Sequence, residues 1–159
     1  MTVLWSSLAG GFLGTLVLST MMRAASELRI TRMDLPFLLG TSVTENRRRA
    51  KVYGYLLHFA LGLSFAIVYG VCFAAIGRSG WWLGALVGAL HALFTSTVLV
   101  NVLLPVLHRR IGTPETAADE IALIEPPGFL MLNYGRNTFL VTLASHMVYG
   151  AIVGWAVRV

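Results

Sequence analysis

KVYGYLLHFALGLSFAIVYGVCFAAI, residues 51–76, decides the fold because it is apolar over a length that can cross a lipid bilayer. Gly54, His58, Gly62 and Ala66 recur in it every four residues and therefore share one face of a helix. Small residues let helix backbones approach closely in lipid. An imidazole in hydrocarbon is costly unless it has a partner. The stretch predicts a membrane helix with one close-packed side that carries a histidine.

A second stretch near the C-terminus has the same plan, with Thr142, His146, Gly150 and Gly154 again spaced by four. Apolar segments at residues 3–22, 52–76, 82–107 and 138–157 are each long enough to span a membrane. The chain of 159 residues is 57% hydrophobic and only 12% charged, which favours an integral membrane protein. We therefore predict a single all-α membrane domain, a bundle of four transmembrane helices.

The two longer polar loops contain segments that are neither spans nor plain linkers. Residues 34–40, DLPFLLG, are apolar but too short to cross a bilayer, so they are expected to be interfacial or re-entrant. Residues 113–124 begin with a Thr-Pro-Glu helix start and separate apolar from acidic positions. They predict a short amphipathic helix on the membrane surface, ended by Pro126 and Pro127.

Basic residues are distributed unequally between the two sides of such a protein. Ten of the twelve Lys and Arg residues fall in the two loops at residues 23–51 and 108–137. By the positive-inside rule both loops are cytoplasmic and both termini lie outside the cell membrane. The densest basic run ends the first loop and comprises Arg47, Arg48, Arg49 and Lys51. This run is a topology signal, or it also binds anionic lipid headgroups. Its position beside a span argues against nucleic-acid binding.

The two halves of the chain, residues 1–77 and 78–159, repeat several features. Gly10 and Gly14 of the first span can be set against Gly84 and Gly88 of the third. In both halves an arginine precedes the histidine of the second span by ten residues. Both halves enter the membrane from the same side, so a duplication would give parallel repeats related by an axis along the membrane normal.

The segments TRMDLPFLLGT (31–41) and IEPPGFLMLNYGRNT (124–138), each followed by a span with a histidine, resemble small multi-pass membrane proteins of bacterial genomes. The resemblance covers most of the chain. It implies a membrane class and location, and it assigns no activity and no functional residue.

His58 and His146 are the first candidates for a binding site, which would lie between the second and fourth spans with Gly62 and Gly150. In one interpretation each imidazole only bonds a serine, a threonine or a backbone carbonyl on a neighbouring helix, for example through Ser64 or Thr142. In the other, the two histidines face each other and ligate one cofactor, most naturally the iron of haem b. A quinone or another small ligand would fit the same residues.

His91 in the third span could add a third imidazole and complete a zinc site. At 1.5 Å per residue, however, it lies about 25 Å from His108 and well above the other two histidines. A bond to Thr95, one turn on, or to a neighbouring helix is the simpler expectation. Asp34 and Glu125 each precede a proline-marked apolar patch and are candidate functional acids, or they pair with Arg32 or Arg136.

The sequence contains no set of residues arranged for nucleophilic, paired-carboxylate or phosphate chemistry. We therefore expect a non-enzymatic membrane protein, either an accessory subunit of a complex or homo-oligomer, or a binder of a small hydrophobic ligand. The alternatives are a haem electron carrier and a small transporter or channel, for which His91 and Asn101 would supply polar positions in the membrane.

Overall fold

The computed structural model describes residues 2–108, 110–111 and 124–159. Within these ranges the regular secondary structure is helical, apart from one isolated β-bridge between Ile111 and Ile124. The amphipathic helix expected at residues 113–124 lies, except for Ile124, outside the described residues.

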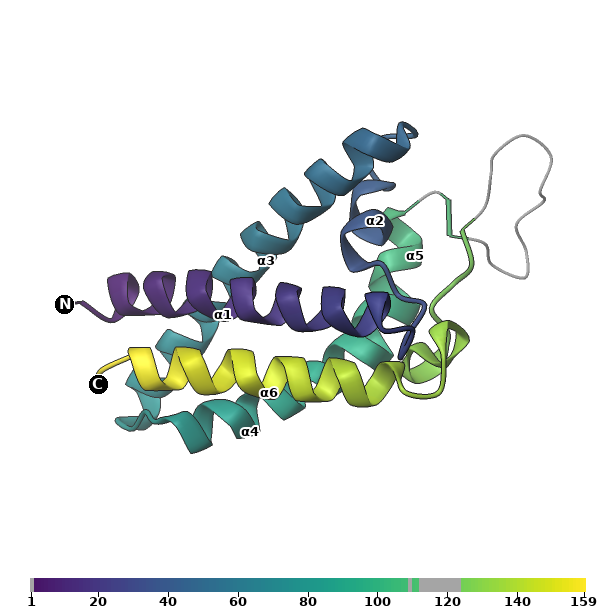
Figure 1. Ribbon diagram of the computed structural model, residues 1–159. Helices are drawn as coiled ribbons and strands as arrows, with labels where there is room; N and C mark the ends of the chain where they lie inside the picture. Colours follow the sequence, from purple (N-terminus) through teal and green to yellow (C-terminus); the bar gives the residue numbers. More distant parts are fainter. Residues whose placement is uncertain (1, 109, 112–123) are drawn as a thin grey trace.

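Four helices are long and apolar enough to cross a membrane: α1 (Val3–Glu27), α3 (Arg47–Ile76), the continuous helix Trp81–Leu107, and α6 (Thr138–Ala156). They contain the predicted spans almost entirely, so the prediction of four apolar helices is confirmed. The two ends of the chain lie at the same end of the molecule, beside the start of α1 and the end of α6 (Figure 1). We use "outer" for this end of the molecule and "inner" for the opposite end.

Local sequence signals set the limits of α3. The side chain of Asn46 accepts hydrogen bonds from the backbone N–H groups of Arg48 and Arg49, both at 3.1 Å. This N-cap lets the basic run form the first turn of the helix. At the other end Gly77 adopts a left-handed conformation, φ 69°, which ends the helix at Ile76.

The third membrane helix changes its winding part-way along. It begins as α4 (Trp81–Phe94), widens into the π-helix η1 (Thr95–Leu103) and finishes as α5 (Leu104–Leu107). The N–H of Leu104 bonds the carbonyl of Leu99, five residues back. Pro105 follows directly and has no N–H to give, while Asn101 donates its side-chain amide to the carbonyls of Ser96 and Thr97. Such wide turns are often found at functional sites.

The helices α4 and α6 pack backbone against backbone. A Cβ added at Gly84 would overlap the carbonyl of Gly150, and one added at Gly88 would overlap the carbonyl of His146. Gly154 lies against Gly80 and Gly84 in the same way. Backbone therefore meets backbone, which only glycine permits.

The helices α1 and α3 form a second pair, whose contacts run along two faces with four-residue spacing. Ser7, Gly11, Thr15 and Ser19 of α1 face Gly70, Ala66, Gly62 and His58 of α3. The adjacent edge of α1 packs on α6, where Gly10 and Gly14 meet Ala156 and Tyr149. The four-residue faces of the sequence are real, but Gly62 packs on Thr15 and Gly150 packs on Gly84. Gly62 and Gly150, which we expected together at a site between the second and fourth spans, therefore do not pack on each other, because each glycine face meets the long helix that precedes it in the chain.

The inner part of α3 leans away from α1, and the short helix α2 (Leu35–Gly40) fills the gap (Figure 1). Asp34 caps α2 by accepting a hydrogen bond from the N–H of Phe37. Gly40 touches the carbonyl of Ala50, and Gly54 touches the carbonyl of Pro36, so α2 is pressed onto the α3 backbone. The 3-10 turn η2 (Phe129–Tyr134) occupies the corresponding place before α6.

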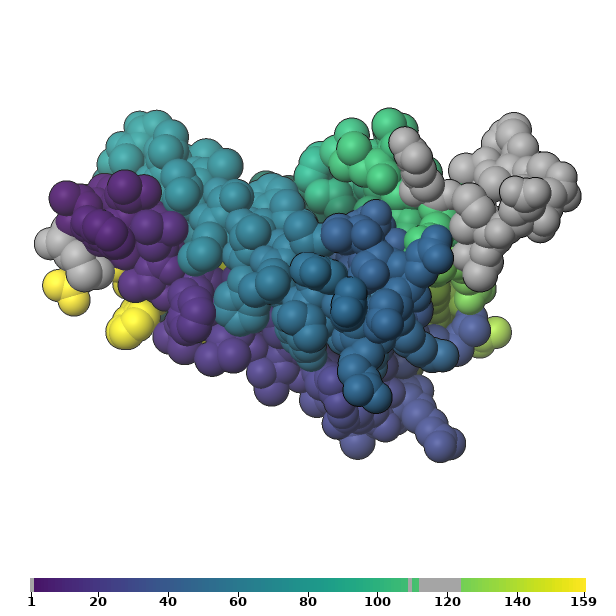
Figure 2. Space-filling model, turned by 90° about the horizontal axis from the view of Figure 1, so that it is seen from above, coloured from purple at the N-terminus to yellow at the C-terminus, as the bar shows by residue number. Residues whose placement is uncertain are grey.

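The space-filling view shows α3 crossing one whole face of the molecule, from the outer end of α1 to the inner segments (Figure 2). Much of α3 and of α4 is apolar and exposed, including Leu56, Val71 and Leu90. Lipid is the environment that suits such a surface.

Candidate functional site

A cavity of about 70 Å³ lies among α1, α3, α4 with η1, and α6, and α2 and η2 close its inner end. Its walls are mostly apolar, and their polar members are Thr15, His58, His91, Thr95, Thr142, His146 and Tyr149. Leu61, which also lines the cavity, is 40% exposed on the outside of α3. The cavity therefore approaches the lipid-facing surface beside Leu61.

The structure brings all three predicted histidines to this one cavity. His58 comes from α3, and its Nδ1 lies 3.0 Å from the hydroxyl of Ser19 on α1. The expected partner Ser64 instead bonds the carbonyl of Ala60 on its own helix. His58 thus connects α3 to α1, at the innermost contact of that helix pair.

His146 is 8% exposed, and its Nδ1 lies 2.8 Å from the backbone carbonyl of Thr142, one turn earlier in α6. The partner of His146 is therefore the backbone of its own helix, whereas one interpretation of the sequence expected a partner on a neighbouring helix. His91 bonds through Nδ1 to the hydroxyl of Tyr69 on α3, at 3.1 Å. The partner of His91 is therefore not Thr95 but Tyr69 of the neighbouring helix α3.

The ring centroids of His91 and His146 are 4.9 Å apart, and their planes are nearly perpendicular. The expectation that His91 lies well above the other histidines is wrong. That estimate measured depth along separate helices, whereas the register between α4 and α6 is fixed by Gly88 lying on the His146 carbonyl. Side-by-side packing, not distance from the helix end, puts the two rings together.

Three hydroxyl residues at the site escaped the sequence analysis: Ser19, Tyr69 and Tyr149. Tyr149 donates a hydrogen bond of 2.6 Å to the carbonyl of Gly62 and so ties α6 to α3. A usable signal existed for Ser19, because it continues the four-residue series Ser7, Gly11, Thr15 along the first span. Nothing in the sequence distinguished the two tyrosines from aromatic residues of the core.

Each of the three imidazoles has a protein partner at Nδ1, and within the described residues none has a hydrogen bond at Nε2. The hydroxyl of Thr95, in the first turn of the π-helix, is buried and also without a partner there. No carboxylate belongs to the walls of the cavity. The described site is therefore mostly apolar and uncharged, and its imidazole Nε2 atoms and the Thr95 hydroxyl are able to form hydrogen bonds with a ligand.

Of the predicted glycines, Gly62 lines the cavity, whereas Gly150 is taken up by the contact with α4. Among the described residues, no three His, Cys, Asp or Glu side chains are placed to hold one metal ion. The sole cysteine, Cys72, is exposed.

The two candidate acids, Asp34 and Glu125, make ion pairs. Asp34 pairs with Lys51 at the start of α3, at 3.0 Å, and Glu125 pairs with Arg32 at 3.5 Å. Arg32, in the first half of the chain, thus pairs with Glu125 of the second half and not with the nearby Asp34. All four side chains are substantially exposed, so these pairs are worth little on their own.

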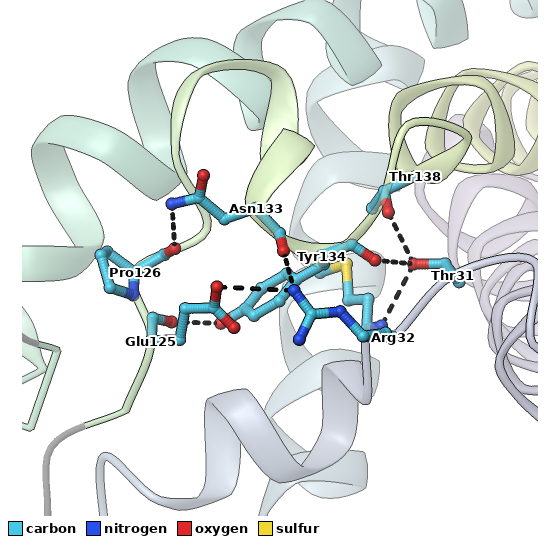
Figure 3. A network of polar contacts seen from close by, with 8 residues as sticks. Thr31, Arg32, Glu125, Pro126, Asn133, Tyr134 and Thr138 are labelled. Carbon is cyan, nitrogen blue, oxygen red and sulfur yellow. Dashed lines mark hydrogen bonds and ion pairs between the residues drawn. The ribbon is translucent and has the colours of Figure 1, made fainter.

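Arg32 belongs to a polar network that joins the two inner loops (Figure 3). Its backbone N–H bonds the carbonyl of Tyr134 at 2.7 Å, and its guanidinium bonds the carbonyl of Asn133. Thr31 and Thr138 share a buried hydrogen bond of 2.7 Å. The Tyr134 hydroxyl donates to the backbone carbonyl of Glu125. Burial, with a smaller contribution from Glu125, raises the pKa of Tyr134 to about 12.

A second connection at the inner end is made by His108, which follows α5 and is 1% exposed. Its Nε2 lies 3.0 Å from the carbonyl of Leu38 and 3.1 Å from the hydroxyl of Thr41, both on or beside α2. Its Nδ1 accepts from the N–H of Arg110 at 3.3 Å. These partners require a neutral ring protonated on Nε2, and burial lowers the pKa of His108.

The basic run begins α3 and lies at the surface. Arg47 stacks over the ring of Phe37, 5.4 Å from its centroid, while Arg48 and Arg49 are exposed. Lys51 is turned toward Asp34 and borders a pocket of about 160 Å³ between the inner end of α1 and α2. Arg23 and Glu27 of α1 form a further ion pair at this pocket.

Comparisons of the chain with protein-family models, with curated proteins and with solved structures found no match. The argument for function therefore depends on the site itself.

Proposed function

We propose that this protein is a non-enzymatic membrane protein that binds a small, mostly apolar ligand in the histidine-lined cavity. The observation that carries the proposal is the arrangement of His58, His91 and His146, which come from three different helices to one apolar cavity. In each of them Nδ1 is hydrogen-bonded to a protein group, and Nε2 has no hydrogen-bond partner within the described residues.

Polar atoms that face an apolar cavity without a partner have a cost that a purely structural role would avoid. The hydroxyl of Thr95 is fully buried in this way. A buried donor or acceptor without a partner costs about 1–3 kcal/mol. Leucine or alanine at these positions would fill the same space in lipid without that cost. A ligand that offers hydrogen bonds to the imidazoles and apolar surface to the walls would recover it.

The size of the cavity favours a narrow ligand over a macrocycle. Pockets for drug-sized ligands measure about 300–1,000 Å³, whereas this cavity is about 70 Å³. A haem held by His58 and His146 would also need a flat gap between the two rings, and His91 packs directly against His146. These observations support the small-ligand proposal over the haem alternative.

The proposal is tested by native mass spectrometry of protein purified from membranes in mild detergent. We expect a bound small molecule in the wild type and its loss in Leu61→Trp, which fills the mouth of the cavity. The matched control is Leu56→Trp, on the same helix but 63% exposed and outside the cavity walls. Its occupancy should equal that of the wild type.

Retention of the ligand in Leu61→Trp would contradict the cavity as its site, and a wild type without any bound molecule would contradict the binding function. A visible absorption spectrum of the same preparation separates the alternatives further. A colourless protein is expected, and a haem spectrum lost in both His58→Ala and His146→Ala would support the electron carrier instead.

We also infer that the two halves of the chain arose by duplication, as parallel repeats. The support is that α3 packs on α1 and α6 packs on α4 through equivalent faces, in which the residues four and eight positions after each histidine touch the preceding helix. In both halves a short helical segment, α2 or η2, precedes the second helix of the pair.

We propose that both termini lie outside the cell membrane and that the two long loops are cytoplasmic, with Arg47, Arg48 and Arg49 near anionic headgroups. The ten-to-two bias of basic residues supports this orientation. Single cysteines at Thr2 and Ser42, in a Cys72→Ser background, provide the test. In intact cells an impermeant thiol reagent should label the first and not the second, and the reverse pattern would overturn the orientation.

A further inference from the structure

The hydrogen bond of His146 fixes which of its ring nitrogens carries the proton. A backbone carbonyl oxygen accepts hydrogen bonds and cannot donate them, so Nδ1, 2.8 Å from the Thr142 carbonyl, must carry the hydrogen. In a neutral imidazole the other nitrogen, Nε2, is then a pure acceptor. The tautomer is set by the backbone of α6, and no other side chain is required to select it.

The surroundings of His146 favour this neutral form. No carboxylate lines the cavity, so an imidazolium there would have no counter-ion among the described residues. A second uncharged polar group, the hydroxyl of Thr95, lines the same cavity and has no hydrogen-bond partner among the described residues. Thr95 is able to donate or accept, whereas His146 Nε2 only accepts.

We propose that the ligand is a narrow apolar chain bearing a hydroxyl group, and that this hydroxyl donates its hydrogen bond to Nε2 of His146. The inference depends on the binding function proposed above and names the ligand class for the same site. Ligands whose polar groups only accept, such as ethers, esters and quinones, leave Nε2 without a hydrogen. The hydroxyl oxygen in turn can accept a hydrogen bond from Thr95.

The probes are 1-decanol and decyl methyl ether, which share an apolar chain and an oxygen but differ in the hydrogen that the oxygen carries. Dissociation constants are measured for the full chain in the same detergent, at matched mole fractions in the micelle. We expect the alcohol to bind roughly five- to tenfold more tightly than the ether, the value of one hydrogen bond. Equal binding of the two probes would overturn the inference and leave the cavity as a binding site.

Two variants at the same position identify the acceptor. His146→Gln retains an acceptor at a similar reach and should keep most of the preference for the alcohol. His146→Leu removes the acceptor and should bind both probes equally. A preference that persists in His146→Leu but is lost in Thr95→Val would overturn the assignment to His146.

Nitrogen NMR of protein labelled with ¹⁵N-histidine tests the premise even if a variant folds poorly. The unliganded wild type should show the His146 ring protonated on Nδ1, and 1-decanol but not the ether should shift its Nε2 resonance. A ring protonated on Nε2 would overturn the inference. Failure of both probes to bind, in a protein with the expected tautomer, would count against the cavity function itself.

Discussion

The two helix pairs, α4 with α6 and α1 with α3, meet through small residues in different ways. Between α4 and α6 glycines stand on both sides, so Gly84 and Gly150 bring backbone directly against backbone. Between α1 and α3 each contact has a side chain on one side, as where Thr15 faces Gly62. The first pair is closed along α4, whereas the second opens at its inner end and takes in α2.

This difference explains where the cavity lies. A helix pair without side chains between its members has no room for a ligand, so the space falls between the pairs and beneath α2. Histidines on α3, α4 and α6 border that space, and Tyr149 bridges it by bonding the Gly62 carbonyl. The closed pair thus fixes the position of two rings, and the open pair supplies the wall that faces lipid.

The largest expected effect compares an added methyl group in the two pairs. Gly84→Ala should destabilise the protein by about 2 kcal/mol, because its Cβ meets a carbonyl that cannot move away. Gly62→Ala should cost less, about 1 kcal/mol, because its Cβ meets the side chain of Thr15 and not a backbone carbonyl. Thermal or denaturant unfolding in detergent gives both values, with Ala75→Leu on the exposed side of α3 as the control.

A double variant sharpens that comparison. Thr15→Ala removes the hydroxyl that Gly62→Ala would displace, so the two substitutions together should cost less than the sum of their separate effects. No single side-chain truncation should relieve Gly84→Ala. If the two glycine substitutions prove equally costly and neither is relieved, the proposed contrast between backbone and side-chain contacts is wrong.

The next prediction concerns His108, which holds α2 in place beside the α1–α3 pair, and the pH dependence of stability that it causes. Since burial lowers the pKa of His108 in the folded protein, the unfolded chain binds a proton first as the pH falls. The stabilisation is complete above the ordinary histidine pKa of about 6.5 and declines below it, by up to about 1.4 kcal/mol per pH unit. We expect unfolding curves of the wild type between about pH 7.5 and 5.5 to show this loss.

His108→Gln provides the control, because glutamine can still donate to the carbonyl of Leu38 but does not titrate in this range. The difference in stability between the wild type and this variant should therefore shrink as the pH is lowered. If this difference in stability stays constant across the range, protonation of His108 does not contribute to the loss of stability at low pH.

The smallest effect is expected in the exposed part of the network in Figure 3. Arg32→Ala or Glu125→Ala should cost less than about 1 kcal/mol through loss of the ion pair, and added salt should reduce that cost. Thr31→Val should cost more, about 1–2 kcal/mol, because it leaves the buried hydroxyl of Thr138 without its partner. An ion-pair loss larger than the threonine loss would reverse this ranking.

The sequence by itself determined the membrane class, the four apolar helices and the faces on which their small residues lie. These features depend on composition and on a four-residue period, both of which are local properties of the chain. It also named His58, His91 and His146 as candidate residues, and the structure brings all three to one cavity, although the depth estimate had separated His91 from the other two.

Only the tertiary structure decided which face meets which. A helix face made of glycines can pack against any other face made of small residues. The sequence therefore allowed Gly62 and Gly150 to be assigned to one site, although Gly62 packs on α1 and Gly150 packs on α4. The same holds for the charges, since Arg32 lies beside Asp34 in sequence but pairs with Glu125 from the other loop. The partners Ser19 and Tyr69 of the histidines depend on helix register, which is fixed by packing between distant segments and has no local signature.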